Sequence, residues 1–181
     1  MPTPPLAWAR RASTTGSSGT AVYDSTRGRA VFVSSAEVME WDGTTWTTLT
    51  PANGPSGAFG VAYDGANART VTFGGLSNLT YLDETRTWNG ATWSLRAPST
   101  KPPGRNFPKV AYDSGRGQVV MFGGLNNCNG YGCTYLQDSW TWNNTKWTSL
   151  STTLAPGATG VFPYDGQLIY DSARGALLLI D

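Results

Sequence analysis

The sequence contains no histidine among its 181 residues. This absence excludes the Ser-His-Asp and Cys-His catalytic arrangements and any metal site that uses imidazole ligands. It also removes the side chain that most often serves as a general base near neutral pH. We therefore expect no catalytic residues, no bound metal and no cofactor in this chain.

Charge and long apolar runs are also scarce. Charged residues make up 14% of the chain, the formal net charge is +1, and lysine and arginine form no run. Such a composition gives no electrostatic basis for binding nucleic acid or an anionic membrane, so we expect neither partner. No window approaches the roughly 18 apolar residues of a membrane span. Residues 1–8 lack the basic and apolar regions of a signal peptide, which predicts a cytosolic chain or the edge of a fragment.

Turn-forming and aromatic residues, in contrast, are abundant. The chain has 22 glycines, 11 prolines and 8 tryptophans. Many turns combined with many aromatic side chains are typical of an all-β protein. Apolar residues show no convincing helical period of 3.6 residues anywhere in the chain.

One set of motifs recurs along the sequence. Tyr-Asp pairs begin at residues 23, 63, 112 and 170, each precedes an apolar run, and the first three units also contain two tryptophans five residues apart. The apolar run ends in Gly-Gly in the second and third units and in Ser34-Ser35 in the first. Fixed motifs at variable steps predict a constant scaffold with loops of different length. The repeated scaffold residues are Gly74, Gly75, Gly123, Gly124, Trp41, Trp46, Trp88, Trp93, Trp142 and Trp147.

Each unit is interpreted as four short strands. The first ends in Tyr-Asp, the second is the apolar run, the third carries the first tryptophan, and a tight Asp-Gly, Asn-Gly or Asn-Asn turn leads to the fourth. The runs 119–122 and 177–180 do not alternate apolar with polar residues, so these strands are expected to be covered on both faces. Repetition assigns the acidic and basic residues of each unit to structural roles. These are Glu37, Glu84 and Asp138, and the pairs Asp24–Arg27, Asp64–Arg69, Asp113–Arg116 and Asp171–Arg174.

These motifs resemble the kelch repeat, which is also found in the central domains of galactose-oxidase-type enzymes. The resemblance is carried by Phe73-Gly74-Gly75 with its tryptophan pair, by Phe122-Gly123-Gly124 with its own pair, and by Pro103-Gly104-Arg105 before Tyr112. It implies an all-β, kelch-type β-propeller with about three complete four-stranded blades plus partial blades at both ends. Residues 1–181 then form a single propeller segment, with units at about 20–50, 60–97 and 108–151, a partial unit at 167–181, and the last strand of a preceding blade in 1–19.

The partial blades leave two interpretations open. The preferred one is a segment of a larger propeller, or a partial gene product. The alternative is a complete chain that closes as a homodimer, with its last two strands meeting the Trp8 strand of a second copy. A lone open arc would expose apolar blade faces and unpaired strand edges to water.

Cysteine is rare, and both cysteines lie in one short stretch. Cys128 and Cys133 flank a glycine-rich sequence between the second and third strands of the third unit. This spacing suits a disulfide that closes a small loop, and it predicts an extracellular or cell-surface location. A pair of free thiols is the alternative.

The function predicted from these features is non-catalytic binding of a protein or a glycan through the inter-strand loops 76–83, 125–137 and 151–167. One alternative is a fragment of a secreted carbohydrate-active or oxidase-type enzyme whose catalytic residues lie outside this chain, and another is a structural spacer. Trp140 departs from the scaffold pattern, because the other units have Met39 and Arg86 at its position. The candidate contact residues are Trp140, Tyr131, Tyr135, Tyr81 and Arg105.

Overall fold

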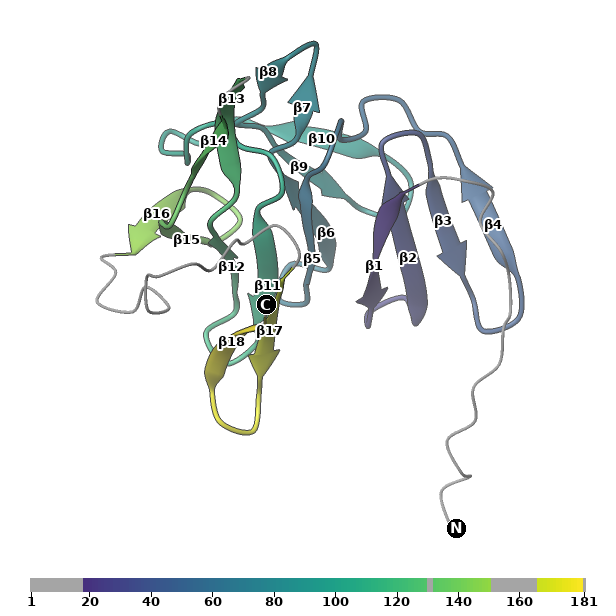
Figure 1. Ribbon diagram of the computed structural model, residues 1–181. Coiled ribbons are helices and arrows are strands. Elements are labelled where there is room, and N and C mark those ends of the chain that lie inside the picture. Colours follow the sequence, from purple (N-terminus) through teal and green to yellow (C-terminus); the bar gives the residue numbers. More distant parts are fainter. Residues whose placement is uncertain (1–17, 130–131, 151–165, 181) are drawn as a thin grey trace.

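The computed structural model describes residues 18–129, 132–150 and 166–180 (Figure 1). This part of the chain is all-β, with 18 strands paired in antiparallel sheets and no helix. No helix capable of crossing a bilayer is therefore present among these residues. The strand expected within residues 1–19 lies almost wholly outside the described residues.

Three four-stranded sheets contain most of the strands, and each falls within one of the expected units. The first sheet contains β1 (Gly19–Asp24), β2 (Arg29–Ser34), β3 (Val38–Trp41) and β4 (Trp46–Leu49). The second contains β5 (Gly60–Asp64), β6 (Arg69–Phe73), β9 (Thr85–Trp88) and β10 (Trp93–Arg96). The third contains β11 (Lys109–Asp113), β12 (Gln118–Phe122), β15 (Ser139–Trp142) and β16 (Trp147–Leu150). Three hairpins complete the described chain: β7 (Leu76–Ser77) with β8 (Thr80–Tyr81), β13 (Leu125–Asn129) with β14 (Gly132–Tyr135), and β17 (Gln167–Asp171) with β18 (Ala176–Ile180).

The turn between the first two strands of each unit is organised by its aspartate. Asp24 Oδ1 accepts hydrogen bonds from the backbone N–H groups of Thr26 and Arg27 at 3.1 and 3.0 Å, and the Arg27 guanidinium donates to the same carboxylate. The aspartates of the third and fourth units bind their arginines in the same way. These predicted turn pairs are confirmed in three units.

The second unit differs from the prediction that paired Asp64 with Arg69. Here Asn67 occupies the turn position and donates to Asp64 from its backbone N–H and its side-chain amide. Arg69 lies two residues further on, opposite Asp64 in the β5–β6 ladder, where the first unit has Arg29. The pairing was wrong because residues 67 and 68 are Asn-Ala instead of Arg-Gly, which hid the true register.

The paired tryptophans face each other across the third and fourth strands. Their ring centroids are 5.6, 5.4 and 5.6 Å apart in the three sheets, with interplanar angles of 44°, 41° and 38°. The tight turns that connect them place Gly43, Gly90 and Asn144 at positive φ, as predicted for Asp-Gly, Asn-Gly and Asn-Asn. The three pairs therefore have equivalent local geometry.

Consecutive sheets pack face to face. Val31 and Val33 of the first sheet contact Trp88 and Trp93 of the second in one buried cluster. A matching cluster joins the second sheet to the third and contains Val71, Phe73, Trp142 and Trp147. Burial of each such apolar side chain stabilises the fold by roughly 1.5–3 kcal/mol. The apolar run 119–122 is buried on both faces, as predicted. The run 177–180 departs from the prediction: Leu177, Leu178 and Ile180 are 37%, 42% and 53% exposed, because β17–β18 is a two-stranded hairpin with no described sheet beyond it.

The first strands of the four units lie next to one another. β1 contacts β5, β5 contacts β11, and β11 contacts β17. Residues of all four strands line one hollow of about 1180 Å³. The sheets therefore stand side by side, with their first strands next to one another (Figure 1). These first strands face the shared hollow.

Candidate binding surface

Two of the three sheets carry an extra hairpin at the same position. β7–β8 follows β6, and β13–β14 follows β12, whereas the first sheet closes this connection with a short turn in which Ser34 N donates to the Glu37 carbonyl at 3.0 Å. Figure 1 shows both hairpins projecting from the same end of the molecule. We call the surface formed by residues 76–81, 125–129 and 132–135 the hairpin surface.

The Gly-Gly pairs allow the chain to leave the sheet at these points. Gly74 and Gly75 have φ values of 79° and 113°, and a Cβ at Gly75 would lie 1.8 Å from the Ser56 carbonyl oxygen. Gly124 has φ 100°, and its Cβ would lie 2.8 Å from the Asn106 carbonyl oxygen. Only glycine combines these backbone angles with so close an approach. The scaffold glycines therefore set the origin of each hairpin.

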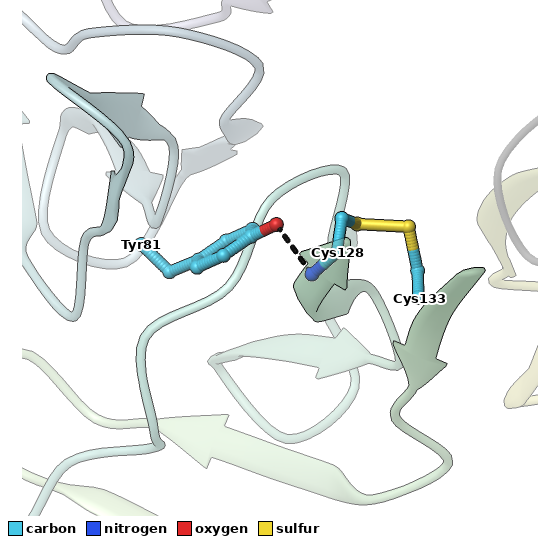
Figure 2. The surroundings of a disulfide bond; sticks show 3 residues. All are labelled: Tyr81, Cys128 and Cys133. Atoms are coloured by element: carbon cyan, nitrogen blue, oxygen red, sulfur yellow. Dashed lines mark hydrogen bonds between the residues drawn. A yellow bond between two sulfur atoms is a disulfide. The ribbon is translucent and has the colours of Figure 1, made fainter. Parts of the chain in front are cut away.

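The two hairpins contact each other as well as the body of the protein. The Tyr81 hydroxyl accepts a hydrogen bond from the backbone N–H of Cys128 at 2.9 Å (Figure 2). Both hairpins also connect to the loop that contains Gly104 and Arg105. Asn126 Nδ2 donates to the Gly104 carbonyl at 3.3 Å, and the backbone N–H of Arg105 donates to the Leu82 carbonyl at 3.1 Å. These bonds place the two hairpins in a fixed relation to each other.

The predicted disulfide is present. It joins Cys128 to Cys133 with a Cα–Cα separation of 3.9 Å and cross-links β13 to β14 (Figure 2). The ladder register of this hairpin shifts between Asn126 and Asn129, next to the cross-linked Cys128, so the strand pairing is irregular there. The cross-link compensates for that irregularity.

The tip of β7–β8 exposes an apolar side chain under backbone strain. Asn78 and Leu79 have φ values of 47° and 63°, the positive-φ pattern of a type I′ hairpin turn. Asparagine tolerates this conformation, but leucine rarely adopts it. The Leu79 side chain is 90% exposed, so packing within the fold does not account for its presence. Sequence analysis placed Leu79 within the candidate loop 76–83 but did not single it out as a contact residue.

The predicted contact residues lie in three different settings. Tyr81 joins the hairpins, and Tyr135 lies on β14 with 38% of its surface exposed, so both belong to the hairpin surface. Tyr131 lies outside the described residues. Trp140 is half-buried against the core of the third sheet and donates from Nε1 to Asp138 at 2.6 Å, and it is not one of the hairpin-surface residues.

Arg105 is a buried anchor, which corrects its prediction as a contact residue. Its side chain is fully buried and donates to both carboxylate oxygens of Asp138, at 2.6 and 2.8 Å. It also donates to the carbonyls of Gly123 and Pro103 at 2.8 and 3.0 Å. Burial alone would raise the pKa of Asp138, but the hydrogen bonds from Arg105 and Trp140 outweigh it, and the net shift is downward. The ion pair fixes the point where β13–β14 leaves the third sheet.

The charged groups near the hairpin surface are paired. Arg86 binds Glu84 at 2.6 Å, and Lys101 binds Asp83 at 2.7 Å. The remaining exposed side chains of the surface are uncharged. In the described chain, no three His, Cys, Asp or Glu side chains are grouped so as to hold a metal ion.

Comparison with known proteins gives a likeness of fold. No protein-family model matches the sequence, and no curated protein matches it. Among solved structures, "Structure of YjhT" is similar, with a TM-score of 0.53 at 19% sequence identity. The match covers 80% of this chain but only 44% of that one, so this chain spans less than half of the similar structure.

Proposed function

We propose that the chain belongs to a kelch-type β-propeller and acts as a non-catalytic binding module. The propeller assignment is supported by the packing of successive four-stranded sheets and by the four first strands that line one hollow. The Gly-Gly pairs and tryptophan pairs support the kelch assignment, since they occupy equivalent places in successive sheets. The binding role is proposed for the hairpin surface, and the partner is a protein or a glycan.

The observation that carries this proposal is the pair of linked hairpins. A four-stranded sheet of this kind needs only a short turn between its second and third strands, since the first sheet makes this connection with Ser34 and Glu37. The second and third sheets instead carry two hairpins that are joined through Tyr81 and Cys128, and one of them is cross-linked. A surface held in one shape loses less entropy when it binds. Backbone strain at an exposed position such as Leu79 is typical of a functional site.

The chemistry of the surface favours a protein or a glycan. Its local charges are neutralised in pairs, which leaves amide, hydroxyl, tyrosine and leucine side chains exposed. Tyrosine is enriched at protein interfaces and combines an apolar ring with a polar group. The electrostatic attraction that dominates nucleic-acid binding is missing at this surface.

An extracellular or cell-surface location is part of the proposal. The Cys128–Cys133 disulfide supports it, because such bonds persist in oxidising compartments. The cross-link would then be stable where the partner is encountered.

A substitution at Leu79 separates binding from folding. Asparagine suits the positive φ of this position, so Leu79→Asn should leave the protein as stable as the wild type, or slightly more stable, while removing the exposed apolar group. The matched control is Leu95→Asn, which removes another exposed leucine, 56% exposed on β10 and not one of the hairpin-surface residues.

The oxidised protein and both variants should be screened against a glycan array and a display library of extracellular protein domains. We expect a ligand whose binding weakens at least about tenfold in Leu79→Asn, and also on reduction of the disulfide, but not in Leu95→Asn. The arm that yields the ligand identifies its class. Equal binding by both leucine variants, or no ligand in either arm, would contradict the proposal.

A further inference from the structure

One inter-sheet contact is repeated three times in the molecule. The Tyr63 hydroxyl donates to Thr26 Oγ1, in the turn of the preceding sheet, at 2.7 Å. The hydroxyl of the equivalent Tyr112 accepts from Ala66 N, also in the preceding turn, at 2.8 Å. The Tyr170 hydroxyl is hydrogen-bonded to Asp113 of the turn before it. Three of the four tyrosines in the Tyr-Asp pairs thus bind the aspartate turn of the sheet before them.

The fourth tyrosine of this set is left open. Tyr23 lies opposite Ala30 in the β1–β2 ladder, as Tyr63 lies opposite Thr70 in the β5–β6 ladder. Tyr63 is 8% exposed, whereas Tyr23 is 62% exposed. The position that binds a neighbouring turn in three units therefore faces solvent in the first.

The same strands and their partners form a larger open face. Each later four-stranded sheet contacts the sheet before it through the face that carries its tryptophan pair. The corresponding face of the first sheet carries Tyr23, Phe32, Trp41 and Trp46. We call these four residues the leading face. Trp41 and Trp46 are only half-buried, whereas Trp88, Trp93, Trp142 and Trp147 in the later sheets are at most 6% exposed.

The β17–β18 hairpin leaves the complementary side open. Ile169, Leu178 and Ile180, which we call the trailing face, are 40%, 42% and 53% exposed. The residues that match Leu178 and Ile180 in the second sheet, Val71 and Phe73, are both 1% exposed because the third sheet covers them. The trailing face is therefore apolar and has no described sheet against it.

The turn beside the trailing face has the same form as the turns that bind a tyrosine. Asp171 Oδ1 accepts from the N–H groups of Ala173 and Arg174 at 3.0 and 3.1 Å, as Asp24 does in the first turn. Within the described chain, no tyrosine of another sheet reaches this turn. The molecule thus presents both halves of the contact that it makes internally three times.

We propose that two copies of this chain associate head to tail, with the leading face of one on the trailing face of the other. Tyr23 of one copy binds the Asp171 turn of its partner, and the tryptophan pair at positions 41 and 46 covers Ile169, Leu178 and Ile180. An interface with two different halves forms a closed assembly only if the rotation returns to its start. Because one chain matches 44% of the similar solved structure, two copies together span most of an assembly of that size. This inference depends on the repeated inter-sheet contact and is independent of the ligand proposed for the hairpin surface.

Sedimentation velocity of the purified chain at micromolar concentration tests the association. We expect a species with twice the mass of the chain. Tyr23→Asp places a carboxylate against the Asp171 turn, and Ile180→Asp places one in the apolar face, so each should raise the dimer dissociation constant by about a hundredfold or more. Tyr23→Phe removes only the hydroxyl and should raise this constant by about tenfold. Leu95→Asp, which adds a carboxylate outside both faces, should leave the mass unchanged.

Mixing the two charged variants distinguishes a head-to-tail interface from misfolding. Tyr23→Asp keeps an intact trailing face and Ile180→Asp an intact leading face, so an equimolar mixture should form a dimer containing one of each through a single intact junction. Far-UV circular dichroism of each variant alone should match that of the wild type. A monomeric wild-type chain, which would indicate that further sheets of a longer polypeptide cover these faces, would overturn the proposal. So would variants that remain dimeric, or a mixture that stays monomeric.

Discussion

The buried Arg105–Asp138 pair gives the sharpest test of how the hairpin surface is built. Arg105→Met keeps the apolar stem but removes the guanidinium that binds Asp138 and the carbonyls of Gly123 and Pro103. Loss of one partner from a buried ion pair costs about 3–5 kcal/mol. Asp138 is 34% exposed and regains some hydration, so we expect about 3 kcal/mol, a large share of a typical folding free energy of about 5–15 kcal/mol.

Urea unfolding followed by tryptophan fluorescence measures this loss. With a slope of about 2 kcal/mol per molar urea, the midpoint should fall by about 1.5 M. The matched control is Lys101→Met, which breaks the exposed pair with Asp83 and should cost less than about 0.5 kcal/mol. Arg105→Lys should recover only part of the loss, because an ammonium cannot donate to both carboxylate oxygens in the same geometry. An effect of Arg105→Met below about 1 kcal/mol would refute the anchor role.

Three further predictions concern the disulfide, pH and the scaffold glycines. Cys128→Ser with Cys133→Ser should lower the free energy of unfolding by about 2 kcal/mol, measured as the difference between urea curves of the variant and the oxidised wild type, and reductant should have no further effect on the variant. Asp113 is buried, which alone would raise its pKa, but hydrogen bonds from its turn lower the pKa below the ordinary value. Its contribution is therefore complete above the unfolded-state pKa near 4 and is lost as pH falls through the lower folded-state value, so Asp113→Asn should flatten the decline of the urea midpoint below about pH 4. Gly75→Ala should cost more than about 2 kcal/mol in the same assay, because its Cβ would lie 1.8 Å from a carbonyl oxygen, whereas Gly43→Ala, with nothing within 4 Å, should show only the cost of its positive φ, about 1 kcal/mol.

The sheets could be predicted from the sequence because their determinants are local and repeated. The Tyr-Asp turn, the apolar run and the tryptophan pair recur in the same order, and the structure places each on the expected strand of three successive sheets. The tight turns followed from Asn, Asp and Gly residues that tolerate positive φ. In the second unit, Ala68 takes positive φ where the others have glycine, and this substitution led to the wrong pairing of Arg69.

The candidate site was predicted only in part. Its loops were located because they interrupt a fixed pattern, and the cysteine spacing indicated the cross-link. The strands of β7–β8 and β13–β14 were missed, since residues such as Leu79 and Asn127 adopt positive φ against their ordinary preference. The roles of Tyr81 and Arg105 depend on contacts with residues 47 and 33 positions away, and no single-sequence pattern encodes contacts of that range.

Neighbouring sheets lie side by side, and one hydrogen-bonded contact between them is repeated along the chain. A double-mutant cycle between Tyr63→Phe and Thr26→Ala measures that contact directly, because the two residues belong to different sheets and share one 2.7 Å hydrogen bond. We predict a coupling free energy of about 1 kcal/mol from the urea unfolding of the four proteins. Effects of the two substitutions that add to within about 0.3 kcal/mol would contradict it, since independent sites behave additively.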